Sequence, residues 1–441
     1  MNQTNDDNKK ADTTTRYEVV PTRKMVSNWL MEPGNNFCIM PYVHLAVESD
    51  GGIRPCCMGS PLKDDNGKPV SIAGKTIGEI IQHPARQKMI DAFDRNEQFA
   101  NCSECWKDNS ENSARVKFST NHTGALEYTL AAMQGTKPEQ RLTWLEVKPG
   151  NRCNLKCRIC GPHNSSSWTK DSFNMGQELG RTKSSLTFKQ SHDYQYNEQC
   201  KWIDEVDVWC NTDQLEHLEL IHMMGGEPFM VPEHFELYRK IIADPKIDHS
   251  KISIWYNTNG TYFPTDEQLE VLSQFRDVRF SLSIDDIGKR FEYQRSLASW
   301  DSVKKNLIKF KDLESSAPRK WFAEADPTTS IYNIWYLEEY VDTMLEMGYQ
   351  DLRKNTHYVA GGINNIRSLH PDAKKKIADH HANTKHPWVT DAIKYMYYKE
   401  EFNRDRAYQR RREIATLDKY RKESFAEVFP EMWELIKDEY K

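Results

Sequence analysis

Three cysteines, Cys153, Cys157 and Cys160, stand within one short stretch near the middle of the chain. Three thiolates in a short loop can ligate three irons of a [4Fe–4S] cube, whereas a closed cluster takes four cysteines. This spacing would therefore leave one iron open to another ligand. Zinc is the main alternative, because Cys3His sites exist and His163 follows closely. The spacing alone favours iron–sulfur and leaves zinc open.

The chain contains ten cysteines, and most of them lie in groups. In a reducing compartment, grouped cysteines bind metal or do chemistry more often than they form disulfides. The N-terminal group comprises Cys38, Cys56, Cys57, Cys102 and Cys105. Two further cysteines, Cys200 and Cys210, stand apart. We expect these two to be small buried hydrophobic residues.

Polar residues and glycines follow several of the apolar runs. Gly225, Gly226 and Glu227 are suited to a ligand, because paired glycines allow close backbone approach and a carboxylate accepts hydrogen bonds from an ammonium. The side chains at the ends of later runs are Asn257, Asn259, Ser281, Ser283, Asp285 and Arg295. The carboxyl ends of parallel strands meet at one mouth, where α/β barrels bind ligands. A simple turn, or capping of the next helix by Asp285 or Asn259, is the alternative.

The elements that must position these residues alternate along the chain. Short apolar runs lie at 142–147, 218–223, 252–256, 278–284 and 321–325, with a weaker one at 349–352. Amphipathic stretches separate them, at 233–242, 267–275, 303–313 and 334–347. Six strand–helix repeats predict an α/β fold with a parallel sheet, either open or curled into part of a barrel. The long polar connection at 160–216 predicts an inserted lid or a less regular segment.

The flanking regions differ from this core, which we place at 140–365. Residues 1–30 lack periodicity and predict a disordered leader. Residues 31–125 are turn-rich, with a helix at 76–93, and we expect a metal to hold this small domain together. Residues 370–441 predict a helical extension. Its Arg and Lys residues form either the solvated face of a packed helix or an interaction surface.

Composition narrows the classes of protein. A net charge of -5 and the absence of a basic excess do not favour nucleic acid as a partner. No apolar run approaches the length of a membrane helix, and the N-terminus has no signal-peptide core. We therefore expect a cytoplasmic protein with no membrane partner.

The motifs together resemble the radical SAM superfamily over residues 142–360. They are Cys-x3-Cys-x2-Cys after the first strand, Gly-Gly-Glu-Pro after the second, Thr-Asn-Gly after the third and Ser-Ile-Asp on the fourth. The resemblance implies a partial (β/α)6 TIM-type barrel, with Cys153, Cys157 and Cys160 as the catalytic cluster ligands. S-adenosylmethionine (SAM) would chelate the open iron and be cleaved to a 5′-deoxyadenosyl radical that abstracts hydrogen from a substrate.

The same resemblance implies which residues contact SAM. Gly226 and Glu227 would face its amino group, and Ser283 and Arg295 its carboxylate. The full set of implied cofactor contacts is Ile159, Gly225, Gly226, Glu227, Asn257, Ser283, Asp285 and Arg295. Ile159 departs from the pattern, because the family often has an aromatic residue there.

The N-terminal cysteines carry a second resemblance, to the SPASM or twitch domain. In that family such domains hold auxiliary iron–sulfur clusters beside radical SAM cores that modify peptides and proteins. The implied ligands of one closed [4Fe–4S] cluster are Cys38, Cys102, Cys105 and either Cys56 or Cys57. Zinc would also suit four thiolates. The domain here precedes the core, whereas in the family it more often follows.

Three functional hypotheses follow. The leading one is a radical SAM enzyme that modifies a peptide or protein side chain, supplied with electrons by a donor such as flavodoxin or ferredoxin. The second is an enzyme with the same core that modifies a small molecule or a nucleotide. The third is an iron–sulfur or redox protein that does not turn SAM over, and a SAM pocket argues against it.

Overall fold

The structure is a computed structural model that describes residues 14–107, 110–111, 113–121, 125–350, 357–359, 362–399 and 401–439. The chain forms two compact units. The N-terminal unit contains residues 1–46, 53–70 and 78–145, and the core unit contains residues 47–52, 71–77 and 146–441. The helices predicted after residue 370 therefore belong to the same unit as the core.

The N-terminal unit consists mainly of short helices. They are α1 (Thr14–Met31), α2 (Met40–Val43), α3 (Ile77–Ile81), α4 (Pro84–Asp94), η1 (Ala100–Cys102), α5 (Ser103–Lys107), α6 (Ala114–Asn121) and α7 (Ala125–Met133). Strand β2 (Ile53–Arg54) belongs to this unit, and β1 (His44–Val47) and β3 (Trp144–Val147) each begin in it and end in the core unit. In the sheet β1 lies between β2 and β3.

Helix α1 corrects one expectation. The disordered leader predicted for residues 1–30 is wrong from residue 14 onward, and residues 1–13 lie outside the described residues. Val26 and Leu30 are fully buried against Val116 of α6. Their spacing of one helical turn puts both side chains on one face of α1. Met25, Val26, Trp29 and Leu30 recur at helical spacing, but Pro21 and the polar residues before it obscure the pattern.

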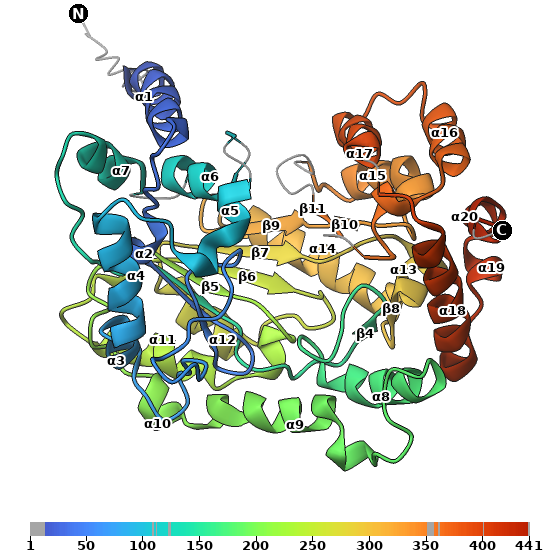
Figure 1. The fold of residues 1–441 in the computed structure, drawn as a ribbon, viewed down its shortest axis with the longest axis horizontal. Helices are drawn as coiled ribbons and strands as arrows, with labels where there is room; N and C mark the ends of the chain where they lie inside the picture. The colour runs from blue at the N-terminus through green and yellow to red at the C-terminus, as the bar shows by residue number, and fades with distance from the viewer. Residues whose placement is uncertain are drawn as a thin grey trace, which may run out of the picture. The chain divides into compact units, whose positions relative to one another are not determined.

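The core unit contains a parallel sheet with connecting helices. The strands β5 (Leu220–Met223), β6 (Ser253–Thr258), β7 (Asp277–Leu282) and β9 (Trp321–Ala325) are hydrogen-bonded in that order and lie side by side in Figure 1. The end of β3 joins them, since the Met224 amide donates to the Val147 carbonyl at 3.0 Å. Stacked aromatic rings such as Tyr256 and Phe280 fill the interior.

The connecting helices alternate with these strands. They are α11 (His234–Ala243), α12 (Asp266–Ser273), α13 (Gly288–Gln294), α14 (Trp300–Ser316) and α15 (Leu337–Glu346). The predicted connection at 160–216 is helical, with α8 (Thr169–Glu178), α9 (His192–Gln199) and α10 (Val206–Trp209). Short 3-10 turns lie between these elements, at η2 (Ser166–Trp168), η3 (Phe188–Gln190), η4 (Cys200–Asp204), η5 (Pro228–Met230), η6 (His249–Lys251) and η7 (Ile334–Tyr336).

Two small strand pairs and a set of C-terminal helices complete the core unit. Strand β4 (Lys156–Cys157) pairs antiparallel with β8 (Arg295–Ser296), and β10 (Thr328–Thr329) pairs parallel with β11 (His357–Tyr358). The C-terminal elements are η9 (Ile366–Ser368), α16 (Pro371–His380), α17 (Pro387–Tyr397), α18 (Arg404–Arg421), α19 (Phe425–Val428) and α20 (Pro430–Ile436).

Five of the six predicted strands are present, at β3, β5, β6, β7 and β9. The weak sixth strand predicted at 349–352 is not a strand at 349–350, and residues 351–352 lie outside the described residues. Within the part of the chain that the structure describes, no helix has the length and apolar character needed to span a bilayer.

Candidate functional site

The loop after β3 brings the three central cysteines together. Cys153 and Cys157 are buried with Leu155 between them, and Cys160 packs against the same cluster. The pairing of β4 with β8 places Cys157 opposite Arg295. Three thiols on one short loop, fixed at one point by a strand pair, fit the ligand set of a cluster with one open iron.

The surroundings of the three thiols disfavour the thiolate form in the absence of a metal. Burial raises the pKa of Cys153 to about 11 and that of Cys160 to about 12, and it also raises the pKa of Cys157. A coordinating metal deprotonates such a thiol outright, so the donor chemistry fits a metal cluster. Within the described residues, no group of three His, Cys, Asp or Glu side chains is arranged so that it could hold a single metal ion.

Polar groups approach two of the sulfurs. The Arg295 guanidinium donates from Nη1 to Cys157 Sγ at 3.6 Å, and Asn259 donates from Nδ2 to Cys153 Sγ at 3.8 Å. The other end of the Arg295 guanidinium lies 2.8 Å from Asp285 Oδ2. Burial lowers the Arg295 pKa, but the Asp285 carboxylate and the Cys157 thiolate together raise it above its usual value. Arg295 is therefore a permanent positive charge beside a candidate cluster ligand.

The Gly-Gly-Glu segment packs against the cysteine loop. Gly225 and Gly226 have φ values of 73° and 49°, a region that favours glycine. A Cβ on Gly226 would lie 2.5 Å from the Arg152 carbonyl oxygen, so the close approach that glycine permits is to the chain's own backbone. The contact predicted between Gly226 and SAM stays a prediction.

Glu227 is fully buried at the end of β5. Its carboxylate accepts hydrogen bonds from the Thr258 hydroxyl and the Asn259 backbone amide, both at 2.8 Å. Burial raises the pKa of Glu227 to about 7. The carboxylate thus ties the loop after β5 to the end of β6, and its contact with the SAM amino group stays a prediction.

The other predicted SAM contacts lie at the carboxyl ends of the strands or on the cysteine loop. Asp285 is buried and accepts from the Thr328 amide at 2.9 Å, in addition to pairing with Arg295. The Ser283 amide donates to the Thr258 carbonyl at 2.8 Å, and its side chain is half-buried. Ile159 is half-buried beside Cys160. Their contacts with SAM stay predictions.

The structure also shows the surroundings of His163 and of the two isolated cysteines, Cys200 and Cys210. The ring of His163, the zinc ligand considered with the three cysteines, packs edge-on against Tyr196 with the ring centroids 4.6 Å apart. Cys200 and Cys210 are 4% and 0% exposed, which confirms them as buried residues outside the groups.

The N-terminal unit has its own cluster of thiols. Four cysteines line one small cavity, and they are Cys38, Cys56, Cys102 and Cys105. Trp106 and Arg115 contribute to its wall. Burial raises the pKa of Cys102 to about 12 and also raises the pKa of Cys38. Four thiols around one largely apolar cavity fit a closed cluster.

The cavity distinguishes the two adjacent cysteines. Cys56 is buried and lines the cavity, whereas Cys57 is exposed and does not line it. A hydrogen bond from the Cys57 side chain lowers the pKa of Cys56 to about 6. The structure therefore favours Cys56 over Cys57 as the fourth ligand.

Removing one of these two thiols tests that assignment. We expect Cys56→Ala to reduce the iron content of the anaerobically reconstituted protein from about eight to about four per chain. Cys57→Ala, the matched control, should retain about eight. Iron and sulfide analysis measures both, and the reverse pattern would assign the site to Cys57.

Two family models match the chain. The model of the radical SAM superfamily matches residues 147–317, and the model of an iron–sulfur cluster-binding domain, SPASM, matches residues 38–106. The chain is a SPASM-containing radical SAM protein. Such a core implies a [4Fe–4S] cluster and SAM, and a SPASM domain implies auxiliary iron–sulfur clusters. Together with the parallel strands, the match confirms the predicted partial TIM-type barrel with an N-terminal auxiliary domain.

Solved structures were also compared with this radical SAM protein. Native anSMEcpe with bound AdoMet is 14% identical, with a TM-score of 0.33, over 63% of this chain and 60% of that one. Native anSMEcpe with bound AdoMet and Cp18Cys peptide is 17% identical, with a TM-score of 0.31, over 47% and 49%. Streptococcus suis SuiB bound to S-adenosylmethionine is 13% identical, with a TM-score of 0.29, over 80% and 68%.

The chain thus spans less than two thirds of the length of the anSMEcpe structures. Among the curated proteins, none matches the sequence.

A row of polar side chains runs across the strand ends of the radical SAM core. His222 of β5 lies 2.5 Å from Asn257 of β6, and Asn257 donates from Nδ2 to Asp326 after β9 at 3.2 Å. Asp326 in turn pairs with His357 of β11 at 3.1 Å. The hydrogen bond from His357 to Asp326 raises the pKa of His357. Asn257, predicted as a SAM contact, is therefore a member of this row, and its contact with SAM stays a prediction.

Residues of helix α18 and of the segment that follows it bind the cysteine loop. The Arg158 side chain is 0% exposed, and its Nη2 lies 2.6 Å from Asp418 Oδ1. It also pairs with Glu423, and its guanidinium lies 3.7 Å from the centre of the Tyr293 ring. The cysteine loop thus depends on residues more than 250 positions away in the chain.

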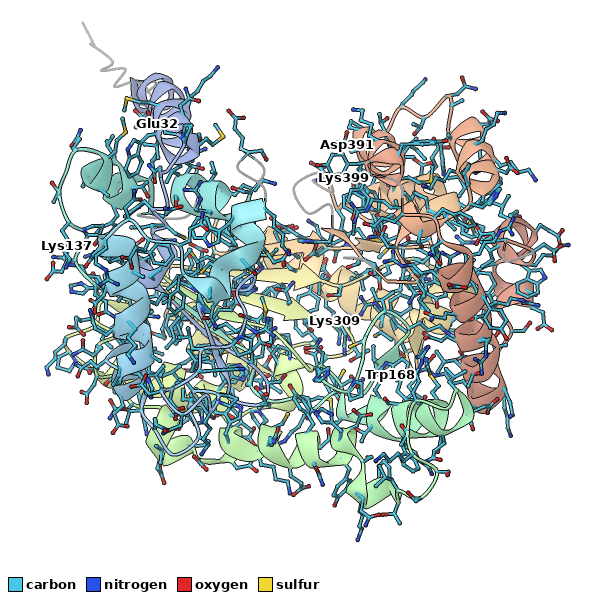
Figure 2. The ribbon with its side chains drawn as sticks, viewed as in Figure 1. Glu32, Lys137, Trp168, Lys309, Asp391 and Lys399 are labelled. Atoms are coloured by element: carbon cyan, nitrogen blue, oxygen red, sulfur yellow. The ribbon has the colours of Figure 1, made fainter. Side chains whose placement is uncertain are left out.

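Arg421 makes a second contact between α18 and the loop. Its Nη1 donates to the Lys156 carbonyl at 2.8 Å and to the Ser296 hydroxyl at 2.9 Å. The guanidinium lies 4.6 Å from the centre of the ring of Trp168, which Figure 2 shows at the start of α8. These partners are not predictable from the sequence, because a single arginine in a charged helix has many alternative roles.

Proposed function

We propose that the protein is an enzyme that binds SAM at the cluster held by Cys153, Cys157 and Cys160, cleaves it reductively and modifies a peptide or protein side chain. When bound, the cluster and SAM supply the low-potential electron and the 5′-deoxyadenosyl radical that takes hydrogen from the substrate. The three thiols on one loop, two of them buried and the third packed against them, are the observation that carries this proposal.

The chain's own residues position these groups. Arg295 places a positive charge beside Cys157, and positive charge or hydrogen bonds near a cluster sulfur make reduction easier. Gly226 and Glu227 fix the neighbouring loop, so the backbone around the SAM site is held before binding. Arg421 and Trp168 cover the loop and help to exclude water.

The row from His222 to His357 lies at the strand ends, where a barrel binds its substrate. Asp326 can accept hydrogen bonds from a substrate amide or amine, and His357 is exposed enough to exchange partners. These groups would orient the side chain that loses hydrogen. The SPASM domain supports a peptide or protein as substrate, because in the family such domains accompany cores that modify them.

The remaining parts of the proposal concern partners and location. A low-potential donor such as flavodoxin or ferredoxin would reduce the cluster. The cytoplasm is the compartment in which such donors and reduced thiols occur together.

SAM cleavage is the direct test. We expect anaerobically reconstituted protein to produce 5′-deoxyadenosine from SAM and dithionite, and the Cys153→Ala, Cys157→Ala, Cys160→Ala triple variant to produce none. The variant loses every protein ligand of the open cluster, so SAM has no iron to bind. Chromatography with mass spectrometry measures the product.

Cys210→Ala is the matched control, because Cys210 is buried and lies outside both cysteine groups. It should keep the wild-type rate within about twofold. Product formation by the triple variant at the wild-type rate would contradict the assignment of the cluster, and no product from the wild type would contradict the enzyme.

A further inference from the structure

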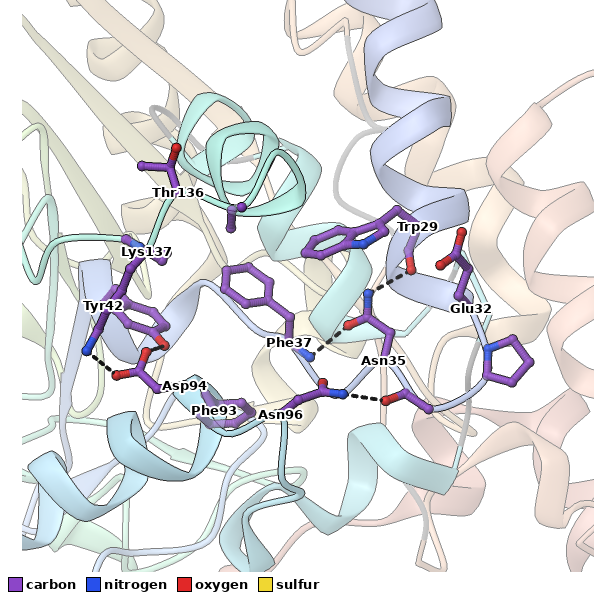
Figure 3. Close-up of a pocket in the computed structure, with 15 residues that line it drawn as sticks. Trp29, Glu32, Asn35, Phe37, Tyr42, Phe93, Asp94, Asn96, Thr136 and Lys137 are labelled. Atoms are coloured by element: carbon purple, nitrogen blue, oxygen red, sulfur yellow. Dashed lines mark hydrogen bonds and ion pairs between the residues drawn. The ribbon is translucent and has the colours of Figure 1, made fainter.

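The N-terminal unit contains a second cavity, separate in its lining from the one with four thiols. Its volume is about 560 Å³. It lies between the end of α1, the turn that follows it, the end of α4 and the turn after α7 (Figure 3). No cysteine lines it, so the cluster chemistry does not account for it.

Aromatic rings form the walls of this cavity. Trp29 and Phe37 have ring centroids 5.4 Å apart, and Phe37 stacks on Tyr42 at 6.0 Å. Phe93 completes the set. Such ring faces carry the negative part of the aromatic quadrupole, so they attract cations.

Hydrogen bonds between asparagine side chains and the backbone hold the walls in place. The Asn35 side chain donates to the Trp29 carbonyl and accepts from the Phe37 amide, both at 2.9 Å. Asn96 donates to the Gly34 carbonyl at 2.8 Å. Figure 3 shows these bonds along the turn. Because the turn is fixed, a ligand would not have to order it on binding.

A carboxylate stands at one side of the cavity and is already oriented. The Tyr42 hydroxyl donates to Asp94 Oδ1 at 2.7 Å, and Lys137 Nζ lies 2.6 Å from Asp94 Oδ2. The Lys137 side chain is 71% exposed, so this ion pair contributes little stability. Glu32 adds a second carboxylate to the lining. The chain's own ammonium thus occupies a position that a ligand cation can take at low cost.

We propose that this cavity binds the guanidinium group of an arginine side chain in a peptide. A guanidinium stacks on aromatic rings and pairs with a carboxylate through two donors, which an ammonium cannot do. It would displace Lys137 from Asp94 and lie among Trp29, Phe37 and Tyr42. The choice of a peptide rests on the proposed function, whereas the recognition of the guanidinium rests on the cavity alone.

The cavity also adjoins residues of the four-thiol site. Phe37 directly precedes Cys38, and the Phe93 ring lies 6.2 Å from the ring of Trp106, which lines the thiol cavity. An arginine bound among these rings would change the surroundings of the auxiliary cluster. The electron paramagnetic resonance spectrum of that cluster is therefore a second measurement, in addition to the binding affinity.

Fluorescence anisotropy with the reconstituted full-length protein tests the proposal. The probe is a short fluorescein-labelled peptide with one arginine between glycines, and its partner carries citrulline, the neutral isostere. We expect the arginine peptide to bind at least about tenfold more tightly than the citrulline peptide, because only the first is a cation. Arginine peptide should also shift the electron paramagnetic resonance signal of the reduced auxiliary cluster.

Three variants define the site. Asp94→Asn should weaken arginine binding about tenfold, and Lys137→Met should strengthen it about threefold by removing the competing cation. Glu97→Gln is the matched control, because this exposed carboxylate pairs with Arg95 and does not line the cavity. Its affinity should stay within about twofold of wild type.

Equal binding of the arginine and citrulline peptides would overturn the proposal, and so would weaker binding by Lys137→Met. Because that variant is expected to gain affinity, a loss of folding cannot imitate the expected result. Absent arginine binding with normal 5′-deoxyadenosine formation would overturn the pocket alone. Normal binding with no SAM cleavage would overturn the proposed enzyme alone.

Discussion

Arg158→Met is expected to lower the free energy of unfolding by about 3–5 kcal/mol and to deplete iron from the central cluster. The Arg158 side chain is completely buried between two carboxylates, those of Asp418 and Glu423. Methionine keeps most of the apolar stem but removes the charge, and the two partly desolvated carboxylates then lose the cation that pairs with both. The Tyr293 ring also loses its stacked guanidinium. Urea unfolding followed by circular dichroism, together with iron analysis, measures both effects.

Arg181→Met provides the matched control for this prediction. Arg181 also pairs with a carboxylate of α18, that of Glu413, but its side chain is 50% exposed. Exposed ion pairs contribute about 0–1 kcal/mol, so this variant should unfold almost as the wild type does and keep its iron. If both variants lost the same free energy of unfolding and the same amount of iron, burial of Arg158 would not determine the strength of its contact.

The same contact shows what sequence reasoning can and cannot reach. The spacing of Cys153, Cys157 and Cys160 was readable because all three ligands lie in one short loop. Five strands were readable because each is a local apolar run. The pairing of Arg158 with Asp418 joins residues 260 positions apart, and no local pattern encodes such a partner.

The sequence predicts where the candidate SAM contacts lie along the chain, but it does not predict which groups of the chain they bind. Glu227, Asn257 and Arg295 all lie at the strand ends or beside the cysteine loop, as their positions after strands indicated. Their side chains, however, already bind groups of the chain itself, such as the Thr258 hydroxyl and the Asp285 carboxylate. A motif predicts which residues lie at the carboxyl ends of the strands, but the hydrogen bonds that they make there depend on packing between strands.

Burial also separates chemically similar neighbours, as with Cys56 and Cys57. In the sequence the two thiols are equivalent, since both follow Pro55 within two residues. The direction of one side chain into the cavity and of the other toward solvent is set by the fold of the whole N-terminal unit.

The stability of the core unit should depend on pH through Asp286. This carboxyl is fully buried, and burial raises its pKa from 3.8 to about 7 although Arg290 lies 3.0 Å away and opposes the shift. Between these two pKa values the folded state holds a proton that the unfolded state has released, so the free energy of unfolding falls as pH rises from about 4 to about 7. The loss from this group is about 4 kcal/mol and is complete above about pH 8.

Asp286→Asn removes this titration, so its free energy of unfolding should fall less than that of the wild type over the same range. Denaturant unfolding at a series of pH values measures the difference between the two curves. Asp379→Asn is the control, because Asp379 pairs with Lys375, away from Arg290, and is 66% exposed. It should leave the slope unchanged. Parallel curves for Asp286→Asn and the wild type would mean that Arg290 keeps the carboxylate ionised throughout, and that the ion pair outweighs the cost of burial.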